Sequence, residues 1–311
     1  MIFKRFVNYC SILCVIFVTQ VDAKQWPRKI NNPDGSTITL PQAPKRILST
    51  SVTVTGTLLA LDAPIVASAA TVTGSFFSQW QTVARQRNLI NVWPAGTINI
   101  EAAYAVQPDL IIVSENGADS ALAHVQLLKS IAPVMIVNYG DKDWQSLAVE
   151  LAHAIGYEKQ SQSLIDSFEK RIRDVKSHIS LPAGTANVVS YNGAGLPNPI
   201  VTATGTHARL IKSLGFEIED PEQSWHSGLQ KSNDFVRAEF EHLVLLKSPT
   251  TFLIRAEQPT ADRFMTDPVL ANLNSVKSKQ VYGLGANSFR IDYYSAKEIL
   301  TNIERYFGNE K

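Results

Sequence analysis

Residues 160–178 read QSQSLIDSFEKRIRDVKSH, and this stretch decides how the rest of the chain is interpreted. Its apolar side chains recur at steps of three and four residues, and charged side chains fill the positions between them, which is the pattern of a helix with one buried face. The apolar positions are Leu164, Ile165, Phe168, Ile172, Val175 and Ile179. Leu181-Pro182 ends the pattern, because proline lacks a backbone N–H and restricts the residue before it. The stretch therefore predicts one unbroken helix of about five turns.

Short apolar runs alternate with helical patterns on both sides of this helix, which is typical of an α/β chain. The runs lie at residues 46–48, 65–68, 110–113 and 134–137 before the helix and at residues 188–191, 251–254 and 280–282 after it. Residues 101–113 and 241–254 also repeat one order, from an acidic residue through a short helix and a proline turn into a buried strand. These patterns favour two halves braced by the helix. Periodicity alone leaves open an ordinary surface helix over a single sheet.

We therefore predict an α/β fold of two α/β lobes joined by a single long rigid helix. The N-terminal lobe would span residues 24–157, the interlobe helix residues 158–180 and the C-terminal lobe residues 181–311. Two domains also suit the length, because about 288 residues exceed what a single core comfortably holds.

The first 23 residues have the pattern of an export signal. Lys4 and Arg5 form a positive start, residues 6–18 are almost uninterruptedly apolar, and residues 21–23 offer small side chains at a cleavage site. The apolar run is shorter than the ~20 residues that cross a bilayer, so a retained membrane anchor is the less favoured interpretation. Residues 11–13 are a poor match to the segment that precedes a lipid-modified cysteine at position 14. We expect cleavage after Ala23 and an exported mature protein.

The composition argues against several classes of protein. Both cysteines, Cys10 and Cys14, lie in the signal, so disulfides and iron–sulfur clusters are excluded from the mature chain. The full chain has 29 basic and 28 acidic side chains, and without the signal 27 of each remain. The formal net charge of the mature chain is therefore zero, so we expect no nucleic-acid partner. No G-x-S-x-G elbow, P-loop or complete G-x-G-x-x-G occurs, so we expect neither an enzyme nor a cofactor. The six histidines are scattered, without a pair at i and i+4, so a direct metal receptor is not favoured.

Several segments resemble the periplasmic binding proteins for siderophores, haem and cobalamin. The similar segments are Lys45–Pro64, Gln107–Val113, Ile131–Pro133 and Gln280–Gly285, and within the family Asp143–Leu147 and Ser288–Ala296 are most similar to the ferric enterobactin-binding members. The likeness covers nearly all of the mature chain. It implies two lobes on one rigid helix, ligand held in a shallow cleft with little closure, and a monomer in the periplasm.

The resemblance also implies delivery of ligand to the permease of an ATP-binding-cassette (ABC) importer in the inner membrane. One acidic residue on each lobe, Glu101 and Glu241, would dock onto arginines of that permease, with Glu239 as a substitute for the second. The alternative is that these are solvated acids at helix starts, where the helix dipole favours negative charge.

The implied ligand is an iron(III) catecholate siderophore similar to ferric enterobactin. Iron(III) held by three catecholates is a trianion with aromatic faces outward, which arginine suits because its planar group pairs with oxygens and stacks on rings. The candidate ligand-binding residues are Arg209, Arg255, Arg290, Trp225, His226, Tyr191 and Tyr294. The siderophore would hold the iron, with His226 as a possible direct ligand where a coordination position is open.

The sequence of the N-terminal lobe differs from those of related proteins at positions that bear on the identity of the ligand. The segment Thr71–Ser78 is shorter than the one that carries a basic residue in the ferric enterobactin-binding protein, and Glu115-Asn116 stands where another relative has an arginine. A different catecholate, or a hydrolysed one, therefore stays open. The alternative is a haem- or cobalamin-binding protein of the same fold, in which Tyr191 or His226 would coordinate haem iron.

Overall fold

The computed structural model describes residues 26–140, 142–228 and 232–309. The predicted export signal at residues 1–23 and its cleavage after Ala23 lie outside these residues. None of the helices in the described ranges is long and apolar enough to cross a bilayer.

The first half of the chain contains a five-stranded sheet in the order β5-β4-β3-β6-β7, and all neighbouring strands in it are parallel. The strands are β3 (Ile47–Ser49), β4 (Ile65–Ala70), β5 (Ile90–Pro94), β6 (Leu110–Ser114) and β7 (Val134–Val137). The helices are α1 (Val52–Ala60), α2 (Ser78–Gln86), α3 (Ile100–Ala105), η1 (Leu122–His124), α4 (Val125–Lys129) and α5 (Trp144–Ile155). An antiparallel hairpin, β1 (Arg28–Asn31) and β2 (Thr37–Leu40), precedes them.

The second half contains another five-stranded sheet, in the order β10-β9-β8-β11-β12. Its strands are β8 (Ala186–Val189), β9 (Asn198–Val201), β10 (Phe235–Ala238), β11 (Thr250–Leu253) and β12 (Val281–Gly283). β8, β11 and β12 are parallel, whereas β9 is antiparallel to both of its neighbours. The helices are α7 (Thr206–Ser213), η2 (Gln223–Trp225), η3 (Phe240–Leu245), α8 (Gln258–Thr266), α9 (Asn274–Lys277) and α10 (Tyr293–Phe307).

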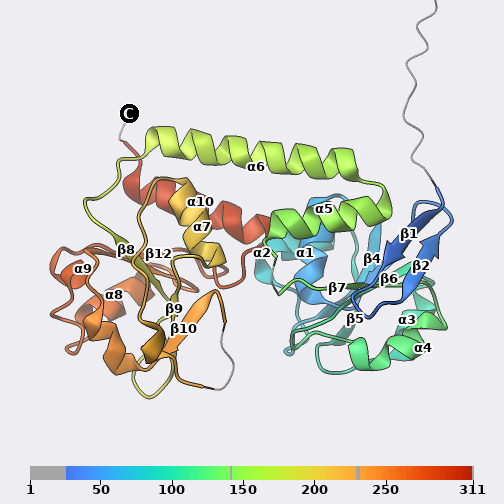
Figure 1. The fold of residues 1–311 in the computed structure, drawn as a ribbon, viewed down its shortest axis with the longest axis horizontal. Helices are drawn as coiled ribbons and strands as arrows, with labels where there is room; N and C mark the ends of the chain where they lie inside the picture. The colour runs from blue at the N-terminus through green and yellow to red at the C-terminus, as the bar shows by residue number, and fades with distance from the viewer. Residues whose placement is uncertain (1–25, 141, 229–231, 310–311) are drawn as a thin grey trace, which may run out of the picture.

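The long helix α6 (Glu158–His178) connects the two halves, and Figure 1 shows it running along both of them. It is a continuous helix of 21 residues, and Phe168 and Val175 from its predicted apolar face are buried. It starts directly after α5, which ends at Gly156 in a left-handed conformation that glycine adopts without strain. The predicted fold of two α/β lobes on one long helix is therefore confirmed.

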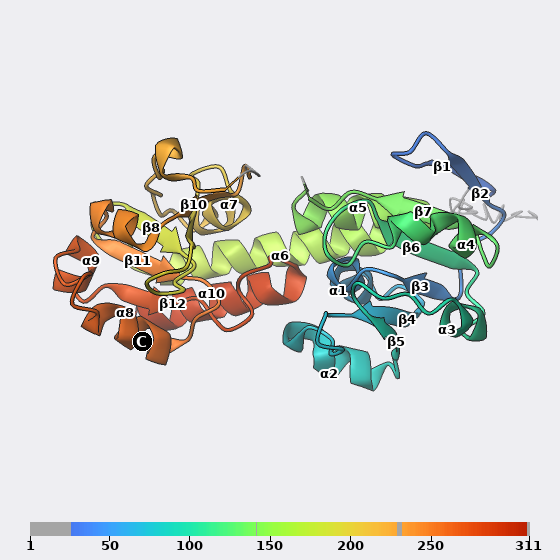
Figure 2. The ribbon, with the colours of Figure 1, turned by 90° about the horizontal axis from the view of Figure 1, so that it is seen from below.

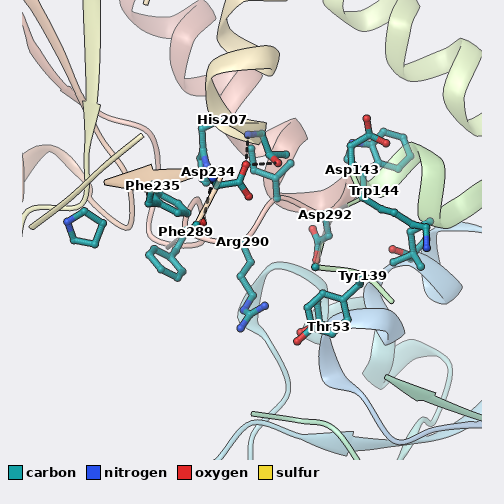
Figure 3. A pocket seen from close by; sticks show the side chains of 18 of the residues that line it. Thr53, Tyr139, Asp143, Trp144, His207, Asp234, Phe235, Phe289, Arg290 and Asp292 are labelled. Carbon is teal, nitrogen blue, oxygen red and sulfur yellow. Dashed lines mark hydrogen bonds between the residues drawn. The ribbon is translucent and has the colours of Figure 1, made fainter. Parts of the chain in front are cut away.

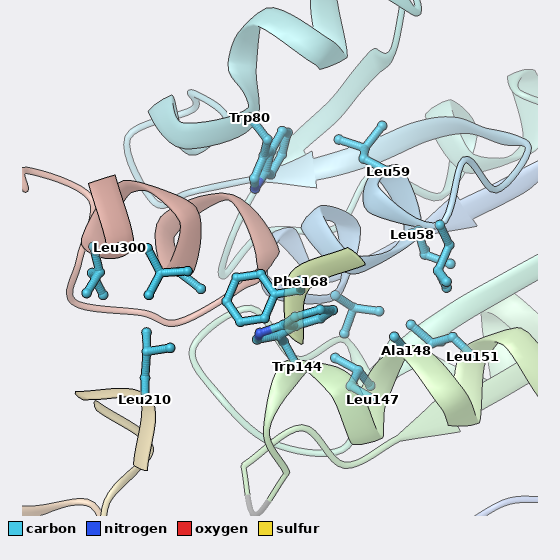
Figure 4. Close-up of a cluster of buried hydrophobic side chains, with 14 of the residues drawn as sticks. Leu58, Leu59, Trp80, Trp144, Leu147, Ala148, Leu151, Phe168, Leu210 and Leu300 are labelled. Atoms are coloured by element: carbon cyan, nitrogen blue, oxygen red, sulfur yellow. The ribbon is translucent and has the colours of Figure 1, made fainter. Parts of the chain in front are cut away.

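A second element, α10, also joins the halves, which the sequence patterns did not predict. α10 belongs to the second half, but its start packs against α1 and α2 of the first half (Figure 2). One hydrophobic cluster runs from Leu58 through Trp144 and Phe168 to Leu300, so the halves share a core (Figure 4). Because α10 reaches across in this way, the predicted lobe boundaries at residues 157/158 and 180/181 stay a proposal.

Candidate functional site

A cavity of about 290 Å³ lies between the two halves. The first half lines it with residues of α1, of α5 and of the segment between β7 and α5, and the second half with residues of β9, β10, the start of α7 and the segment before α10. The lining residues are Thr53, Thr57, Phe77, Tyr139, Gly140, Lys142, Asp143, Trp144, Leu147, Pro199, Thr206, His207, Ser232, Asp234, Phe235, Arg237, Phe289, Arg290, Ile291 and Asp292. Figure 3 shows the side chains from both halves facing one another.

The second half lines its side of the cavity with aromatic rings. Phe235 and Phe289 stack with their centroids 5.8 Å apart and their planes 13° apart. The guanidinium of Arg255 lies 4.8 Å from the centroid of Phe289. The edge of His207 meets Phe235 at 5.6 Å, and the ring donates a hydrogen bond from Nε2 to the Ser288 carbonyl at 2.7 Å. Burial lowers the pKa of His207, so it is neutral near pH 7 and packs as an aromatic ring.

Arg255 is held behind this aromatic pair by an unusual backbone conformation. Its φ of 53° lies in the left-handed region, which side chains other than glycine enter at a cost of about 1 kcal/mol. Its backbone N–H donates to Ser288 Oγ at 2.8 Å, and its guanidinium donates to Asn192 Oδ1 at 3.2 Å. These bonds direct the guanidinium over Phe289 and supply positive charge behind the ring.

Arg290 reaches from the second half to the first. Its side chain is exposed, and its guanidinium lies 5.8 Å from the ring centroid of Tyr139 (Figure 3). The Tyr139 hydroxyl donates to Asp119 Oδ1 at 2.8 Å, and the other oxygen of Asp119 accepts from Ser51 Oγ at 2.6 Å. Burial and the charge of Asp119 raise the pKa of Tyr139, so its phenol stays neutral and presents a fixed ring to Arg290.

Two further cations line the cavity in different states. Arg237 on β10 is exposed and, among the described residues, its guanidinium makes no hydrogen bond or ion pair. Lys142 instead forms an ion pair with Glu150 at 3.0 Å and donates to the Asn138 carbonyl at 2.9 Å. Arg237 therefore offers its full charge to a ligand, whereas that of Lys142 is partly compensated.

The three carboxylates of the lining each brace the start of a helix. Asp143 Oδ1 accepts from Ser146 N at 2.8 Å, Asp234 Oδ1 from Thr206 N at 2.8 Å, and Asp292 Oδ1 from Ser295 N at 2.9 Å. Burial raises the pKa of Asp292. Because these oxygens already accept backbone hydrogen bonds, they repel an anion less than free carboxylates would.

Residues 47–288 match the family model for periplasmic binding proteins. The chain belongs to the periplasmic binding protein family. This binding protein is 38% identical over 300 residues to the ferric enterobactin-binding periplasmic protein FepB of Escherichia coli O6:H1, covering 93% of this chain and 94% of FepB. It is 49% identical to holo-ViuP in its crystal structure, with a TM-score of 0.86 over 92% of this chain and 96% of ViuP.

A more distant structure shows the fold alone. A FhuD fold-family periplasmic binding protein of Bacillus subtilis superimposes with a TM-score of 0.71 at 20% identity, over 89% of this chain and 99% of that one. The predicted resemblance is confirmed by these comparisons. The prediction of a binding protein rather than an enzyme is confirmed as well, because the family consists of transport components.

The seven predicted ligand residues of this periplasmic binding protein occupy different places. Arg290 lines the cavity, and Arg255 contacts the ring of Phe289, which lines it as well. Arg209 lines an adjoining cavity of about 150 Å³ beside Trp144, and its guanidinium donates to the Thr204 carbonyl at 2.6 Å. The structure therefore brings two of the three arginines to the site and leaves Arg209 beside it.

The predicted aromatic and histidine contacts lie outside the cavity lining. The ring of Tyr191 packs on Phe264, and its hydroxyl donates to Asp267 at 3.0 Å. Tyr294 is partly buried on α10, and burial raises its pKa. Contact of these two tyrosines with ligand stays a prediction, because Tyr191 packs against the core of the second half and Tyr294 is partly buried, both outside the cavity lining.

Trp225 and His226 lie near the site on the segment beside β10. Trp225 stacks on His242 with centroids 5.7 Å apart. His226 Nδ1 accepts a hydrogen bond from the backbone N–H of Arg237 at 3.3 Å. They border the strand that carries Arg237 without lining the cavity, so direct contact with ligand stays a prediction for both.

Sequence reasoning missed Phe235, Arg237, Tyr139 and Lys142. The run Phe235–Ala238 carried a usable signal, since Val236 and Ala238 are buried and alternate with Phe235 and Arg237 as on a half-exposed strand. No comparable pattern marks Tyr139 or Lys142, which lie in the segment after β7.

Glu101 and Glu241 occupy equivalent places in the two halves. Both are exposed in the first turn of a short helix, α3 or η3. α3 leads into β6 and η3 leads into β11, and these two strands hold the same place in their sheets.

The described residues contain no group of three His, Cys, Asp or Glu side chains placed to hold a metal ion.

Proposed function

We propose that this periplasmic binding protein captures an iron(III) catecholate siderophore in the cavity between its halves and delivers it to the permease of an ABC importer. The observation that carries the proposal is the wall of the second half. There the stacked rings of Phe235 and Phe289 stand among three guanidinium groups, those of Arg237, Arg255 and Arg290.

This wall suits a ferric catecholate for two physical reasons. A catecholate is a flat ring with its negative oxygens on one edge, so its face can stack on phenylalanine while its edge pairs with a guanidinium. Each cation near 4 Å contributes on the order of 4 kcal/mol in a partly screened cleft before desolvation is subtracted. Two exposed arginines therefore suffice for tight binding. The likeness to FepB, a protein named for binding ferric enterobactin, supports the same class of ligand.

The proposal is tested by titrating the purified protein with ferric enterobactin, with ferric linear enterobactin and with the iron-free siderophore, following tryptophan fluorescence. Trp144 lines the cavity, so a strongly absorbing ferric ligand is expected to quench its emission at sub-micromolar concentration. Iron-free siderophore should bind more weakly, because it lacks the charge of the complex. Equal binding of iron-free and ferric forms, or binding of haem alone, would contradict the proposal.

We further propose that residues 1–23 direct the chain to the periplasm, where it acts as a monomer, and that Glu101 and Glu241 dock onto the permease. Their equivalent positions in the two sheets support a partner that engages both halves in the same way. Glu101→Ala and Glu241→Ala should leave ligand binding intact and reduce uptake of ferric siderophore by cells. Glu169→Ala, an exposed acid on α6, is the matched control and should leave uptake unchanged.

A further inference from the structure

Residues 287–292 cross from the second half to the first, and we call them the crossing segment. On the second half, Ser288 is fully buried and held by hydrogen bonds of its hydroxyl, its backbone N–H and its carbonyl. Its Oγ accepts from Arg255 N at 2.8 Å and donates to the Gly285 carbonyl at 2.7 Å, and its carbonyl accepts from His207 at 2.7 Å. Ser288 is therefore fixed to the second half.

Four residues later the chain is fixed to the first half. Asp292 is 7% exposed, and its Oδ2 accepts a hydrogen bond from Gln79 Nε2 on α2 at 3.1 Å. A Cβ added to Gly56 of α1 would lie 2.8 Å from Asp292 Oδ2 and 3.0 Å from Trp80 Nε1, so α1 and α2 close tightly around this carboxylate. The Ser78 hydroxyl adds another bond across the halves, to Asn287 Oδ1.

The two attachment points lie very close along the chain. Four residues span at most roughly 14 Å even when fully extended, so the crossing segment acts as a short tether that limits how far the halves can separate. α6 runs along one side of both halves (Figure 1), so it imposes no such limit on the opposite side. The residues between the two points include Phe289 and Arg290, which line the cavity.

We propose that Asp292 is a positioning residue of the ligand site, which anchors the crossing segment in the first half and so sets the width of the cavity and the placement of Phe289 and Arg290. This inference rests on the proposed function. It predicts that loss of the anchor weakens ligand binding although the cations and rings are all retained. Electrostatics alone predicts the opposite, since removing a carboxylate from the wall of an anion site should strengthen binding.

The test compares Asp292→Asn with Gln79→Ala and with Gln162→Ala as a matched control. Asparagine still caps a helix, so α10 keeps its start in the first variant, and the second leaves α10 untouched. Gln162 is exposed on α6 and outside the cavity lining, and its amide donates to Asp166 of its own helix. Asp292→Asn and Gln79→Ala are expected to weaken binding by about tenfold, because each removes one hydrogen bond to a charged group. Binding is measured with ferric enterobactin or ferric linear enterobactin, whichever the unaltered protein binds more tightly. Gln162→Ala should bind as tightly as the unaltered protein.

The distance between the halves supplies a readout that does not depend on ligand. The chain from residue 24 onward has no cysteine, so spin labels can be placed at Leu127→Cys and Val269→Cys, both exposed and in different halves. Pulsed electron–electron double resonance on the ligand-free protein should give a broader and longer distance distribution for Asp292→Asn and Gln79→Ala, and an unchanged one for Gln162→Ala. Unchanged distances and equal or tighter binding in both anchor variants would overturn the inference. Failure of the unaltered protein to bind any ferric catecholate would refute the proposed function but leave the distance test intact.

Discussion

The two sheets share one strand order but differ in direction. The first is parallel throughout, whereas in the second β9 is antiparallel to both neighbours and β10 forms the edge. A parallel sheet lines a cleft with the loops and helix starts at its carboxyl edge, as Thr53 and Tyr139 do here. An edge strand instead lines the cleft with its own alternating side chains, and β10 presents Phe235 and Arg237 in this way. The sheet in which the single strand β9 is reversed thus lines the cavity with strand side chains, whereas the fully parallel sheet lines it with loops and helix starts.

The two walls of the cavity, one from each half, also differ in the positive charge that they leave available to a ligand. On the first half, Tyr139 is bound to Asp119 and Lys142 to Glu150. On the second half, Arg237 and Arg290 carry exposed guanidinium groups. The comparison suggests that the second half recognises the charge of the ligand and the first half fits its shape. Each of the following variants tests that division.

The largest effect is expected from Arg290→Ala. It removes an exposed cation from the second wall together with its contact to Tyr139 across the cavity. Loss of one charge-assisted contact should weaken ferric catecholate binding about 10- to 100-fold, measured by fluorescence titration. Arg305→Ala, which removes an exposed arginine of α10 that does not line the cavity, is the control and should bind normally. Equal losses in the two variants would mean that general charge, not the wall, attracts the ligand.

Phe289→Leu should have a smaller effect on binding, of about five- to tenfold, because a stacked aromatic face contributes about 0.5–1.5 kcal/mol beyond its buried area. Leucine keeps an apolar side chain but loses the faces that meet Phe235 and Arg255.

On the first wall, Tyr139→Phe should have a still smaller effect. Phenylalanine keeps the ring and loses only the hydrogen bond from the hydroxyl to Asp119, so binding should change by less than about twofold. A larger loss for Tyr139→Phe than for Phe289→Leu would reverse the roles of the two walls.

Local patterns explain which parts of the fold could be predicted. The apolar repeat at residues 160–178 predicts α6, found at Glu158–His178, because helix periodicity depends only on near neighbours. The buried runs predicted seven strands, but β1, β2, β5, β9 and β10 were missed. β9 contains Pro199, which speaks against a strand in the sequence, and β10 is an edge strand with the exposed Arg237 in it.

The candidate site was harder to predict because it depends on contacts between distant residues. Tyr191 was predicted as a cleft residue at a strand end, yet it lies partly buried outside the cavity lining, where its hydroxyl donates to Asp267, 76 positions away. Tyr294 is only four residues from Arg290, but α10 begins between them and turns its side chain elsewhere. Arg255 and Arg290 were predicted because both stand where a strand or loop ends, and the structure places Arg290 in the cavity lining and Arg255 beside it. The rings next to them could not be predicted, because they come from segments that sequence order does not connect.

Among the variants that change a charge, the smallest effects, and the sharpest in sign, should come from the ion pair of the first wall. Lys142 lies 3.0 Å from Glu150, so its charge is already partly compensated and Lys142→Met should weaken ferric catecholate binding by only about twofold. Glu150→Gln removes the competing carboxylate and keeps its size, so the freed ammonium should strengthen binding by about two- to threefold at low ionic strength. Both effects should shrink in titrations at high salt, since the pair is partly exposed. If Lys142→Met instead costs as much as Arg290→Ala, the charge of the ligand is met equally by both halves and the asymmetry between the walls has no energetic meaning.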